Sequence, residues 1–263
     1  MINVAVTGAS GKMGRRIISN VLRSEETQLS AAFDLMNVGS DAGEVAQLGN
    51  LGVAISSVED MESVLKSSNT DVLIDFTIAD ATAVNAPRVA SSGVNLVIGT
   101  TGLTDEQKAT IEDSIRQNNV AGIISPNYAV GVNVFFGILK EAAKYLGDTD
   151  IEVIEAHHNQ KKDAPSGTAI RAADVISEAL GGKDYVHGRQ GLAPRGKEIG
   201  IHAVRGGDIV GDHTVLFAGD GERIEIKHQA HSRQAFAGGA VKAAIWIAKA
   251  KPGVYTMADI LGL

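Results

Sequence analysis

The stretch Ile2-Asn-Val-Ala-Val-Thr-Gly-Ala-Ser-Gly-Lys-Met-Gly14 decides the fold of this chain. Residues 2–7 form a short apolar run that is typical of a buried strand, glycines follow at every third position, and residues 15–22 have a helical pattern. In such a unit the first glycine permits a tight turn, the second lets the backbone approach a pyrophosphate, and the third lets the helix pack closely on the strand. The order predicts a dinucleotide-binding unit, although Ser10 stands where the commonest fingerprint has its second glycine.

A carboxylate follows the next apolar run at the distance that dinucleotide-binding units use. Residues 29–33 are predicted to form a strand, and Asp34 comes directly after it, 20 residues beyond Gly14. Such a carboxylate can accept hydrogen bonds from an adenosine ribose, although an aspartate after a strand is also an ordinary turn residue. Because Leu35 and Met36 come next rather than an arginine, the sequence does not choose between NADH and NADPH.

Strands continue at intervals through the first half of the chain. We expect them at residues 53–56, 71–77, 95–100 and 121–125, separated by helices or loops such as 105–118. This alternation predicts an α/β protein with a Rossmann-type doubly wound parallel sheet. Polar, turn-forming residues follow three of these strands, at the sheet edge where open α/β folds bind ligands, so we expect the nicotinamide there.

A second stretch, Glu155-Ala-His-His-Asn-Gln-Lys-Lys-Asp-Ala-Pro-Ser-Gly-Thr168, gathers two histidines and two lysines before a helical pattern. An imidazole can donate a proton near neutral pH, and lysines supply positive charge. Pro165 favours a helical backbone dihedral at the helix start, whose free amides can receive a carboxylate. The strand-like run 151–155 delivers the histidines from a sheet edge. The stretch therefore predicts a site that holds a small polyanion and protonates it.

Other interpretations of this stretch and of the remaining histidines stay open. The stretch also fits a solvated, charged loop before an ordinary amphipathic helix with a serine cap. We expect no metal site, because His157 and His158 point to opposite sides of an extended chain and no further His or Cys stands at ligand spacing. The other histidines lie singly in strand or loop patterns and are predicted to be structural: His187, His202, His213, His228 and His231.

The composition excludes several classes of protein. The 263 residues carry a net charge of −7 and 44% hydrophobic residues, which is typical of a folded globular protein and disfavours nucleic-acid or anionic-membrane binding. There is no cysteine, so disulfides, thiolate nucleophiles and cysteine-ligated metals are excluded. No apolar run approaches the roughly 18 residues of a membrane span, and the N-terminus lacks a secretory signal pattern. We expect a cytoplasmic protein.

The pattern of the chain changes after residue 127. A helix and three strands with alternating polar and apolar residues are expected at 133–146, 199–205, 213–217 and 223–229. Alternation predicts a second α+β domain on an open mixed sheet with one buried and one exposed face. The final helix, 235–249, is expected to return to the first domain. The predicted domains are 1–127 with 236–263 for dinucleotide binding, and 128–235 for substrate binding and oligomerisation.

Six segments together carry a resemblance that extends essentially end to end. They are Val6-Thr-Gly-Ala-Ser-Gly-Lys-Met-Gly14, Gly99-Thr-Thr-Gly102, Glu155-Ala-His-His158, Lys161, Asp163-Ala-Pro-Ser-Gly-Thr168 and Arg205-Gly-Gly-Asp-Ile-Val-Gly211. In these segments the chain resembles the 4-hydroxy-tetrahydrodipicolinate reductase (dihydrodipicolinate reductase) family. The resemblance implies NADH- or NADPH-dependent reduction of a cyclic dicarboxylate to tetrahydrodipicolinate in lysine biosynthesis, by a homotetramer that associates through the sheets of the second domain.

The resemblance also implies roles for individual residues. His157 would be the proton donor, and Lys161 would be a second donor and charge partner. His158 would contact the substrate, and Gly167 and Thr168 would bind a carboxylate. The implied cofactor contacts are Gly8, Ala9, Ser10, Gly11, Lys12, Met13, Asp34, Gly99, Thr100, Thr101, Ser125, Pro126, Asn127 and Tyr128.

Two other functions fit the same two-domain plan. The first is an NAD-dependent amino-acid or aldehyde dehydrogenase, which would turn over without the dipicolinate precursor. The second is a non-catalytic dinucleotide sensor, which would need no proton donor such as His157 or Lys161. Dependence of turnover on the substrate distinguishes these functions.

Overall fold

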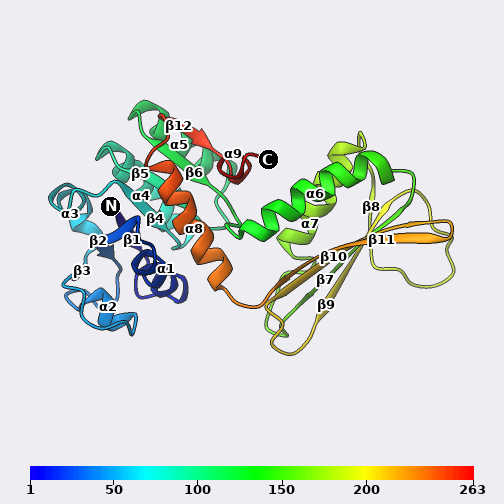
Figure 1. The fold of residues 1–263 in the computed structure, drawn as a ribbon, viewed down its shortest axis with the longest axis horizontal. Coiled ribbons are helices and arrows are strands. Elements are labelled where there is room, and N and C mark those ends of the chain that lie inside the picture. Colours follow the sequence, from blue (N-terminus) through cyan, green and yellow to red (C-terminus); the bar gives the residue numbers. More distant parts are fainter. The chain divides into compact units, whose positions relative to one another are not determined.

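The chain folds as two compact units, and the computed structural model describes residues 1–263 (Figure 1). The first unit comprises Met1–Ala129 and Gln234–Leu263, and the second comprises Val130–Arg233. The domain limits expected from the sequence lie within two residues of these boundaries. None of the helices is both long enough and apolar enough to cross a membrane.

The first unit contains a seven-stranded parallel sheet in the order β12-β6-β5-β4-β1-β2-β3. Its strands are β1 (Ile2–Thr7), β2 (Thr27–Phe33), β3 (Ile55–Ser56), β4 (Val72–Asp75), β5 (Asn95–Ile98), β6 (Ala121–Ile124) and β12 (Gly253–Tyr255). Its helices are α1 (Lys12–Arg23), α2 (Ala42–Val45), α3 (Met61–Ser67), α4 (Ala79–Ser91), α5 (Asp105–Gln117), α8 (Gln234–Ile247) and α9 (Met257–Leu261), with a 3₁₀ turn η1 (Val58–Asp60). The predicted Rossmann-type sheet is confirmed.

Helices cover both faces of this sheet. On one face Val4 and Val6 of β1 share a core with Ile17 of α1 and with the buried side of α8. On the other face Ala5 shares a core with the buried sides of α3, α4 and α5, and Val89 of α4 belongs to this core. Because both faces are buried, the strands are short apolar runs rather than alternating ones. As expected, α8, the helix predicted at residues 235–249, packs in the first unit.

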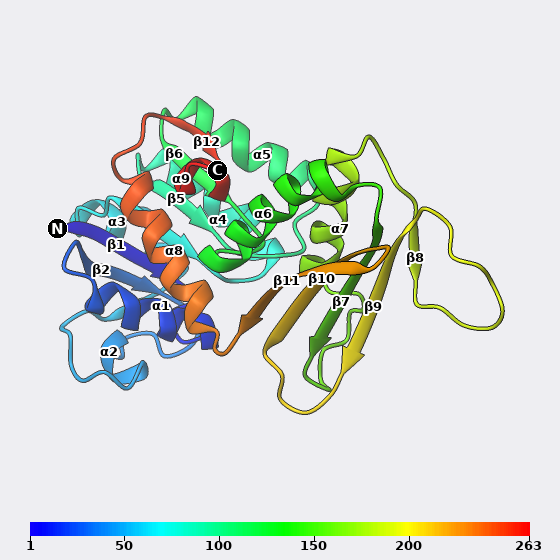
Figure 2. The same cartoon turned by 45° about the vertical axis from the view of Figure 1, so that its right-hand side comes forward.

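The second unit contains a five-stranded mixed sheet in the order β11-β10-β7-β9-β8 (Figure 2). Its strands are β7 (Asp150–His157), β8 (Tyr185–His187), β9 (Ile199–Arg205), β10 (Gly211–Gly219) and β11 (Glu222–Ala230), and its helices are α6 (Val130–Leu146) and α7 (Gly167–Ala179). Both helices lie on one face, where Leu139 of α6 and Ile176 of α7 pack on Val153 and Val215 of the sheet. This arrangement confirms the predicted second α+β domain.

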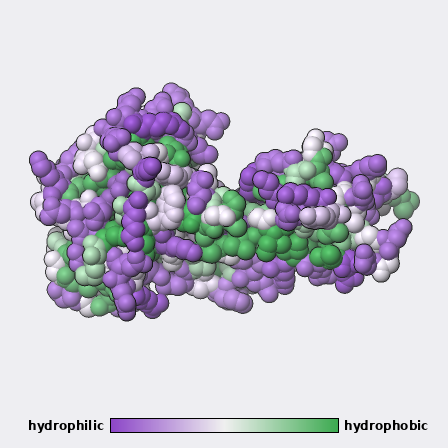
Figure 3. Space-filling model, turned by 45° about the horizontal axis from the view of Figure 1, so that its top comes forward, coloured by the Kyte–Doolittle hydropathy of each residue, from purple (hydrophilic) through white to green (hydrophobic).

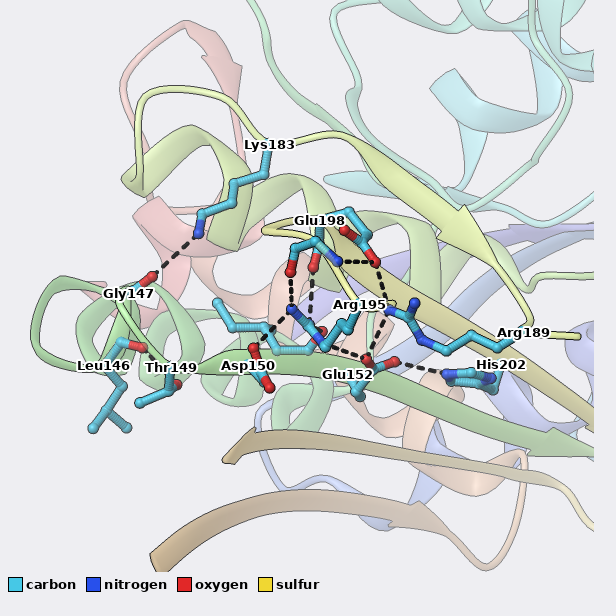
Figure 4. Close-up of polar contacts among 12 residues, drawn as sticks. Leu146, Gly147, Thr149, Asp150, Glu152, Lys183, Arg189, Arg195, Glu198 and His202 are labelled. Carbon is cyan, nitrogen blue, oxygen red and sulfur yellow. Dashed lines mark hydrogen bonds and ion pairs between the residues drawn. The ribbon is translucent and has the colours of Figure 1, made fainter. Parts of the chain in front are cut away.

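The opposite face of the second sheet is not covered by a helix. Ile154 and Val204 on this face are 37% and 49% exposed. A band of hydrophobic residues between hydrophilic borders is also visible on the second unit in Figure 3, a view that brings the upper side of Figure 1 forward. A charged cluster also lies on the uncovered face, where Glu152 accepts hydrogen bonds from the side chains of Arg189, Arg195 and His202 (Figure 4). The face thus combines exposed apolar side chains with a set of ion pairs.

Candidate active site

The glycine turn joins β1 to α1 in the geometry that the sequence predicts. The chain turns at Gly8, whose φ of +76° is one that other residues rarely adopt. Gly11 is the N-cap residue of α1, and no side chain accepts a hydrogen bond from the first amides of this helix. A Cβ on Gly14 would lie 2.0 Å from the Gly8 carbonyl oxygen and 2.8 Å from Ala9 Cα, so the helix packs directly on the turn. Because the first amides of a helix have no partner within the helix, these residues fit the pyrophosphate of a dinucleotide.

Asp34 stands at the end of β2 and is bonded to the glycine turn. The Ser10 amide donates to Asp34 Oδ2 at 2.8 Å, and the Met36 amide donates to Oδ1 at 2.9 Å. Each carboxylate oxygen has a second lone pair, and the side chain is partly exposed. Asp34 can therefore hold the turn and accept a hydrogen bond from a ribose hydroxyl at the same time. Leu35 and Met36 beside it are 79% and 67% exposed.

A buried network supports the ends of β4 and β5. Asp75 accepts hydrogen bonds from the amide of Thr77 at 2.9 Å and from its hydroxyl at 2.7 Å. Thr82 Oγ1 donates to Thr100 Oγ1 at 2.8 Å, and Thr100 in turn accepts from the Thr77 amide. Burial raises the pKa of Asp75, and the threonine hydrogen bonds partly oppose that rise. The network fixes the loops that follow β4 and β5, where the sequence predicts the nicotinamide.

The predicted cofactor contacts differ in their exposure. Those at least partly exposed are Gly8, Ser10, Gly11, Lys12, Met13, Asp34, Gly99, Thr101, Pro126 and Asn127. Thr100 and Ser125 are buried, and their hydroxyls bond within the protein. Ala9 and Tyr128 are fully buried, and the Tyr128 hydroxyl donates to the carbonyls of Ile98 and Ile123. The Ala9 side chain therefore lies in the core beneath the glycine turn, whereas the Tyr128 side chain is bonded to β5 and β6, and only the backbone of these two residues can meet a ligand.

The second unit buries a carboxylate beside the predicted proton donor. The alternation of β7 places Glu155 and His157 on the same face, and Glu155 is 0% exposed. Glu155 Oε1 accepts from the Ser166 amide at 2.9 Å and from Arg205 at 2.8 Å. Glu155 Oε2 accepts from His157 Nδ1 and from Arg205, both at 2.7 Å. Burial alone would raise the pKa of Glu155, but these hydrogen bonds outweigh burial and hold the pKa below its usual value, so Glu155 is ionised.

This carboxylate defines which nitrogen of His157 can exchange a proton. An ionised carboxylate only accepts hydrogen bonds, so Nδ1 of His157 carries a hydrogen, and Nε2 is the ring nitrogen that can gain and lose a proton. The Nε2 atom faces Gly211 of β10, where an added Cβ would lie 3.0 Å from it. The ring is 9% exposed and meets the His213 ring edge-on, with centroids 5.1 Å apart.

His213 belongs to the same cluster, although the sequence predicts only a structural role for it. The residue is 4% exposed, and its Nε2 lies 3.0 Å from Ser166 Oγ. Burial, together with the neighbouring His157, lowers the pKa of His213 to about 4, so its ring is neutral at neutral pH. His213 thus supports the site as a packed neutral side chain in β10.

The loop after β7 carries Lys161, the other predicted catalytic residue, and His158, a predicted substrate contact. Lys161 Nζ donates to both carboxylate oxygens of Asp163, at 2.8 and 2.9 Å. The Lys161 amide donates to the carbonyl of His158, which closes a turn, and His158 is half-buried. The Asp163 carbonyl accepts from Arg205, so the loop is attached to the buried cluster.

The start of α7 offers open backbone. Ser166 caps the helix through a hydrogen bond from the Ala169 amide, and Gly167 and Thr168 form its first turn. Nothing lies within 4 Å of the position that a Cβ would take on Gly167, so a ligand carboxylate can approach the main chain there. Pro165 precedes the cap rather than occupying the first turn, which corrects the predicted helix start.

Three residues of the cluster have no functional role in the sequence prediction: Glu155, Arg205 and His213. The two-residue spacing of Glu155 and His157 in a strand could have placed both on one face. Arg205 could not have been paired with Glu155, because its position depends on the register in which β7 pairs with β9. His213 likewise depends on the pairing of β7 with β10, in which His213 lies opposite Glu155.

Comparison with known proteins gives a consistent result. The sequence matches the family model "Dihydrodipicolinate reductase, N-terminus" over residues 2–128 and "Dihydrodipicolinate reductase, C-terminus" over residues 131–261. It is 72% identical to the 4-hydroxy-tetrahydrodipicolinate reductase of Methanococcoides burtonii, over 100% of both chains.

Solved structures show the same two-part architecture. The dipicolinate-bound dihydrodipicolinate reductase from Paenisporosarcina sp. TG-14 is 30% identical with a TM-score of 0.80, and the match covers 97% of both chains. An amine dehydrogenase from Mycobacterium smegmatis matches with a TM-score of 0.62 over 97% of this chain and 94% of that one. At 16% identity the second match shows a shared fold alone.

Proposed function

This chain belongs to the dihydrodipicolinate reductase family, and from this premise we infer that it reduces 4-hydroxy-tetrahydrodipicolinate to tetrahydrodipicolinate in lysine biosynthesis. The observation that carries the proposal is the buried Glu155, which bonds both His157 and the Ser166 amide at the start of α7. One carboxylate thus joins a proton donor to a helix start that can receive an acid group of the substrate. A dinucleotide sensor would need neither.

The first unit would hold the nicotinamide cofactor. Its pyrophosphate would lie on the amides at the start of α1, and Asp34 would bond the adenosine ribose. The exposed backbone of Gly99 and Thr101 and the loop of Pro126 and Asn127 would border the nicotinamide. Asp34 is followed by apolar residues rather than an arginine, so nothing beside the ribose excludes NADH, and the proposed cofactor is NADH or NADPH.

The second unit would bind the substrate and supply the proton. The bound cofactor provides a hydride, and the reduced ring then needs a proton on carbon. His157, when both of its ring nitrogens carry hydrogen, would donate that proton from Nε2 and become the neutral ring with its hydrogen on Nδ1, and Lys161 would be a second donor and a charge partner. The amides of Gly167 and Thr168 would hold a carboxylate of the substrate, whose negative charge otherwise opposes the arrival of a hydride. His158 would contact the substrate from the loop.

We also propose a homotetramer that associates through the second-unit sheets and works in the cytoplasm. The support is the uncovered sheet face, where Ile154 and Val204 are more than a third exposed. Such a face is a candidate for burial against other copies of the chain.

A coupled test follows the absorbance of NADH or NADPH with and without the dipicolinate precursor. Oxidation should require the precursor, and His157→Gln should lower kcat by about 100-fold with KM nearly unchanged, because a positioned general acid contributes at least that factor. Turnover with amino acids or aldehydes instead, or cofactor binding without any turnover, would contradict the proposed function.

A further inference from the structure

Glu155 is bonded by donors from three separate parts of the second unit. His157 lies two residues further along β7, Arg205 ends β9, and Ser166 caps α7. All four hydrogen bonds to the carboxylate are between 2.7 and 2.9 Å long, and the carboxylate is fully buried. A group with this many partners constrains the relative positions of the elements that supply them.

Arg205 makes this arrangement possible. Burying a carboxylate without a charge partner costs several kcal/mol in free energy. The Arg205 guanidinium bonds both carboxylate oxygens in the planar two-pronged geometry that arginine favours. The same guanidinium bonds the Asp163 carbonyl in the lysine loop at 2.6 Å. Each Glu155 oxygen therefore has one bond to Arg205 and keeps a second lone pair for another donor.

The two remaining hydrogen bonds of Glu155 join it to the proposed proton donor and to the proposed binding site for a substrate carboxylate. Glu155 Oε2 fixes the hydrogen on Nδ1 of His157, and Oε1 holds the amide of Ser166, directly before Gly167. We propose that Glu155, held by Arg205, is a positioning residue that sets the proton-donating Nε2 of His157 at a fixed place relative to the helix start that receives the substrate carboxylate. This inference rests on the proposed reductase function.

The alternative is that the Glu155–Arg205 pair only stabilises the fold. Glu155→Gln distinguishes the two roles, because it keeps the shape of the side chain but offers one accepting oxygen and one donating NH₂ to four donors. The NH₂ group must then face two former donors. If it faces His157, Nδ1 must either lose its hydrogen bond or accept one, and a ring that accepts at Nδ1 keeps its single hydrogen on Nε2 and cannot become the doubly protonated acid.

The experiment measures steady-state kinetics of the full-length protein with NADH and the dipicolinate precursor across pH. For Glu155→Gln we expect kcat to fall on the order of 100-fold, at the low end of what a positioned general acid contributes. KM for the precursor should rise several-fold, whereas the Kd for NADH, measured by fluorescence, should not change. His157→Gln should lower kcat without the rise in KM.

The pH profile adds a readout that a structural role would not move. The titratable and charged groups around the His157 ring are Glu155 on its own strand, Arg205 on β9 and His213 on β10, with His228 beyond His213 on β11. Removing the negative charge of Glu155 disfavours the protonated ring. The fall in kcat with rising pH should therefore move to lower pH in Glu155→Gln and recover partly in Glu155→Asp, which restores the charge at a shorter reach.

Glu152→Gln is the matched control. Glu152 lies three residues earlier on β7 and also accepts from two arginines and a histidine, but it lies on the opposite sheet face (Figure 4). The Glu152→Gln variant should have the same kcat per active site and the same pH profile as the wild-type protein. If both variants lower kcat equally with an unmoved pH profile, or if neither lowers it, the positioning role is overturned.

A second measurement keeps the inference testable if Glu155→Gln does not fold. In the wild-type protein, ¹⁵N NMR of labelled histidines should show neutral His157 with its hydrogen on Nδ1. A hydrogen on Nε2 would overturn the inference even if the wild-type protein is an active reductase. Absence of precursor-dependent NADH oxidation in the wild-type protein would instead remove the proposed function, so the two failures are distinguishable.

Discussion

Replacing Gly14 with alanine should destabilise the first unit more than the same substitution at Gly8 or Gly11. The new methyl carbon would lie 2.0 Å from the Gly8 carbonyl oxygen, whereas ordinary contacts begin at 3.4 Å. The oxygen cannot move freely, because it accepts a hydrogen bond from the Gly11 amide at 2.9 Å. The start of α1 must therefore move away from β1 by more than about 1 Å, in a core that is close-packed.

The size of the effect follows from this displacement. Inserting a methyl group into a packed site costs about 1–3 kcal/mol, and rigid backbone on both sides of Gly14 favours the upper value. At about 2–4 °C for each kcal/mol, the midpoint of thermal unfolding should fall by roughly 6–12 °C. The Kd for NADH should also rise, because α1 carries the amides that the pyrophosphate would use.

Gly11→Ala is the matched comparison for this prediction. Gly11 has a φ of −74°, which alanine adopts readily, and its Cβ would lie 3.1 Å from the Gly8 oxygen, only a few tenths of an ångström closer than an ordinary contact, so the unfolding midpoint should fall by no more than about 4 °C. Its methyl group would still hinder a pyrophosphate, so NADH binding should weaken by about 10-fold or more. Differential scanning calorimetry and fluorescence titration measure the two effects. An unfolding midpoint of Gly14→Ala within 2 °C of the wild-type value would refute the close-packing argument.

Two further predictions concern the second unit. The pKa of His213 is about 4 in the folded chain and 6.5 in a model peptide. Between these two pH values the unfolded chain binds a proton that the folded chain does not, so the free energy of unfolding should fall as pH decreases from about 6.5 to 4, by up to roughly 3 kcal/mol. Thermal unfolding between pH 7 and 4.5 should show this loss, and His213→Gln should flatten the dependence; an equally steep dependence in the variant would assign the loss to other groups. Gly211→Ala would place a Cβ 3.0 Å from His157 Nε2, so kcat should fall about 10-fold or more while the unfolding midpoint changes little. Unchanged kcat in this variant would show that Nε2 does not need the space beside Gly211.

Local patterns were sufficient for most of the elements. β9 was predicted with the bounds that it has in the structure, and α6 begins at Val130, three residues before its predicted start. Two short strands, β8 and β12, were not predicted. Each has only three residues, too few for a periodic signal, and each forms because an edge strand of an existing sheet, β9 or β6, offers unpaired backbone groups.

The amino-acid sequence by itself determined the strand-glycine-helix unit, the parallel sheet, the alternating strands of the second unit and the residue types available for proton donation. The strands, helices and turns that make up these features depend on residues close in the chain, so a periodic pattern or a turn residue is enough to indicate them, and the alternation of strand and helix then favours parallel pairing. Only the tertiary structure decided that Glu155 accepts from Arg205 and Ser166, and that Tyr128 faces the core. Those positions depend on strand register and on packing between distant segments, where the free energy of burying a charge or a ring decides which partners meet.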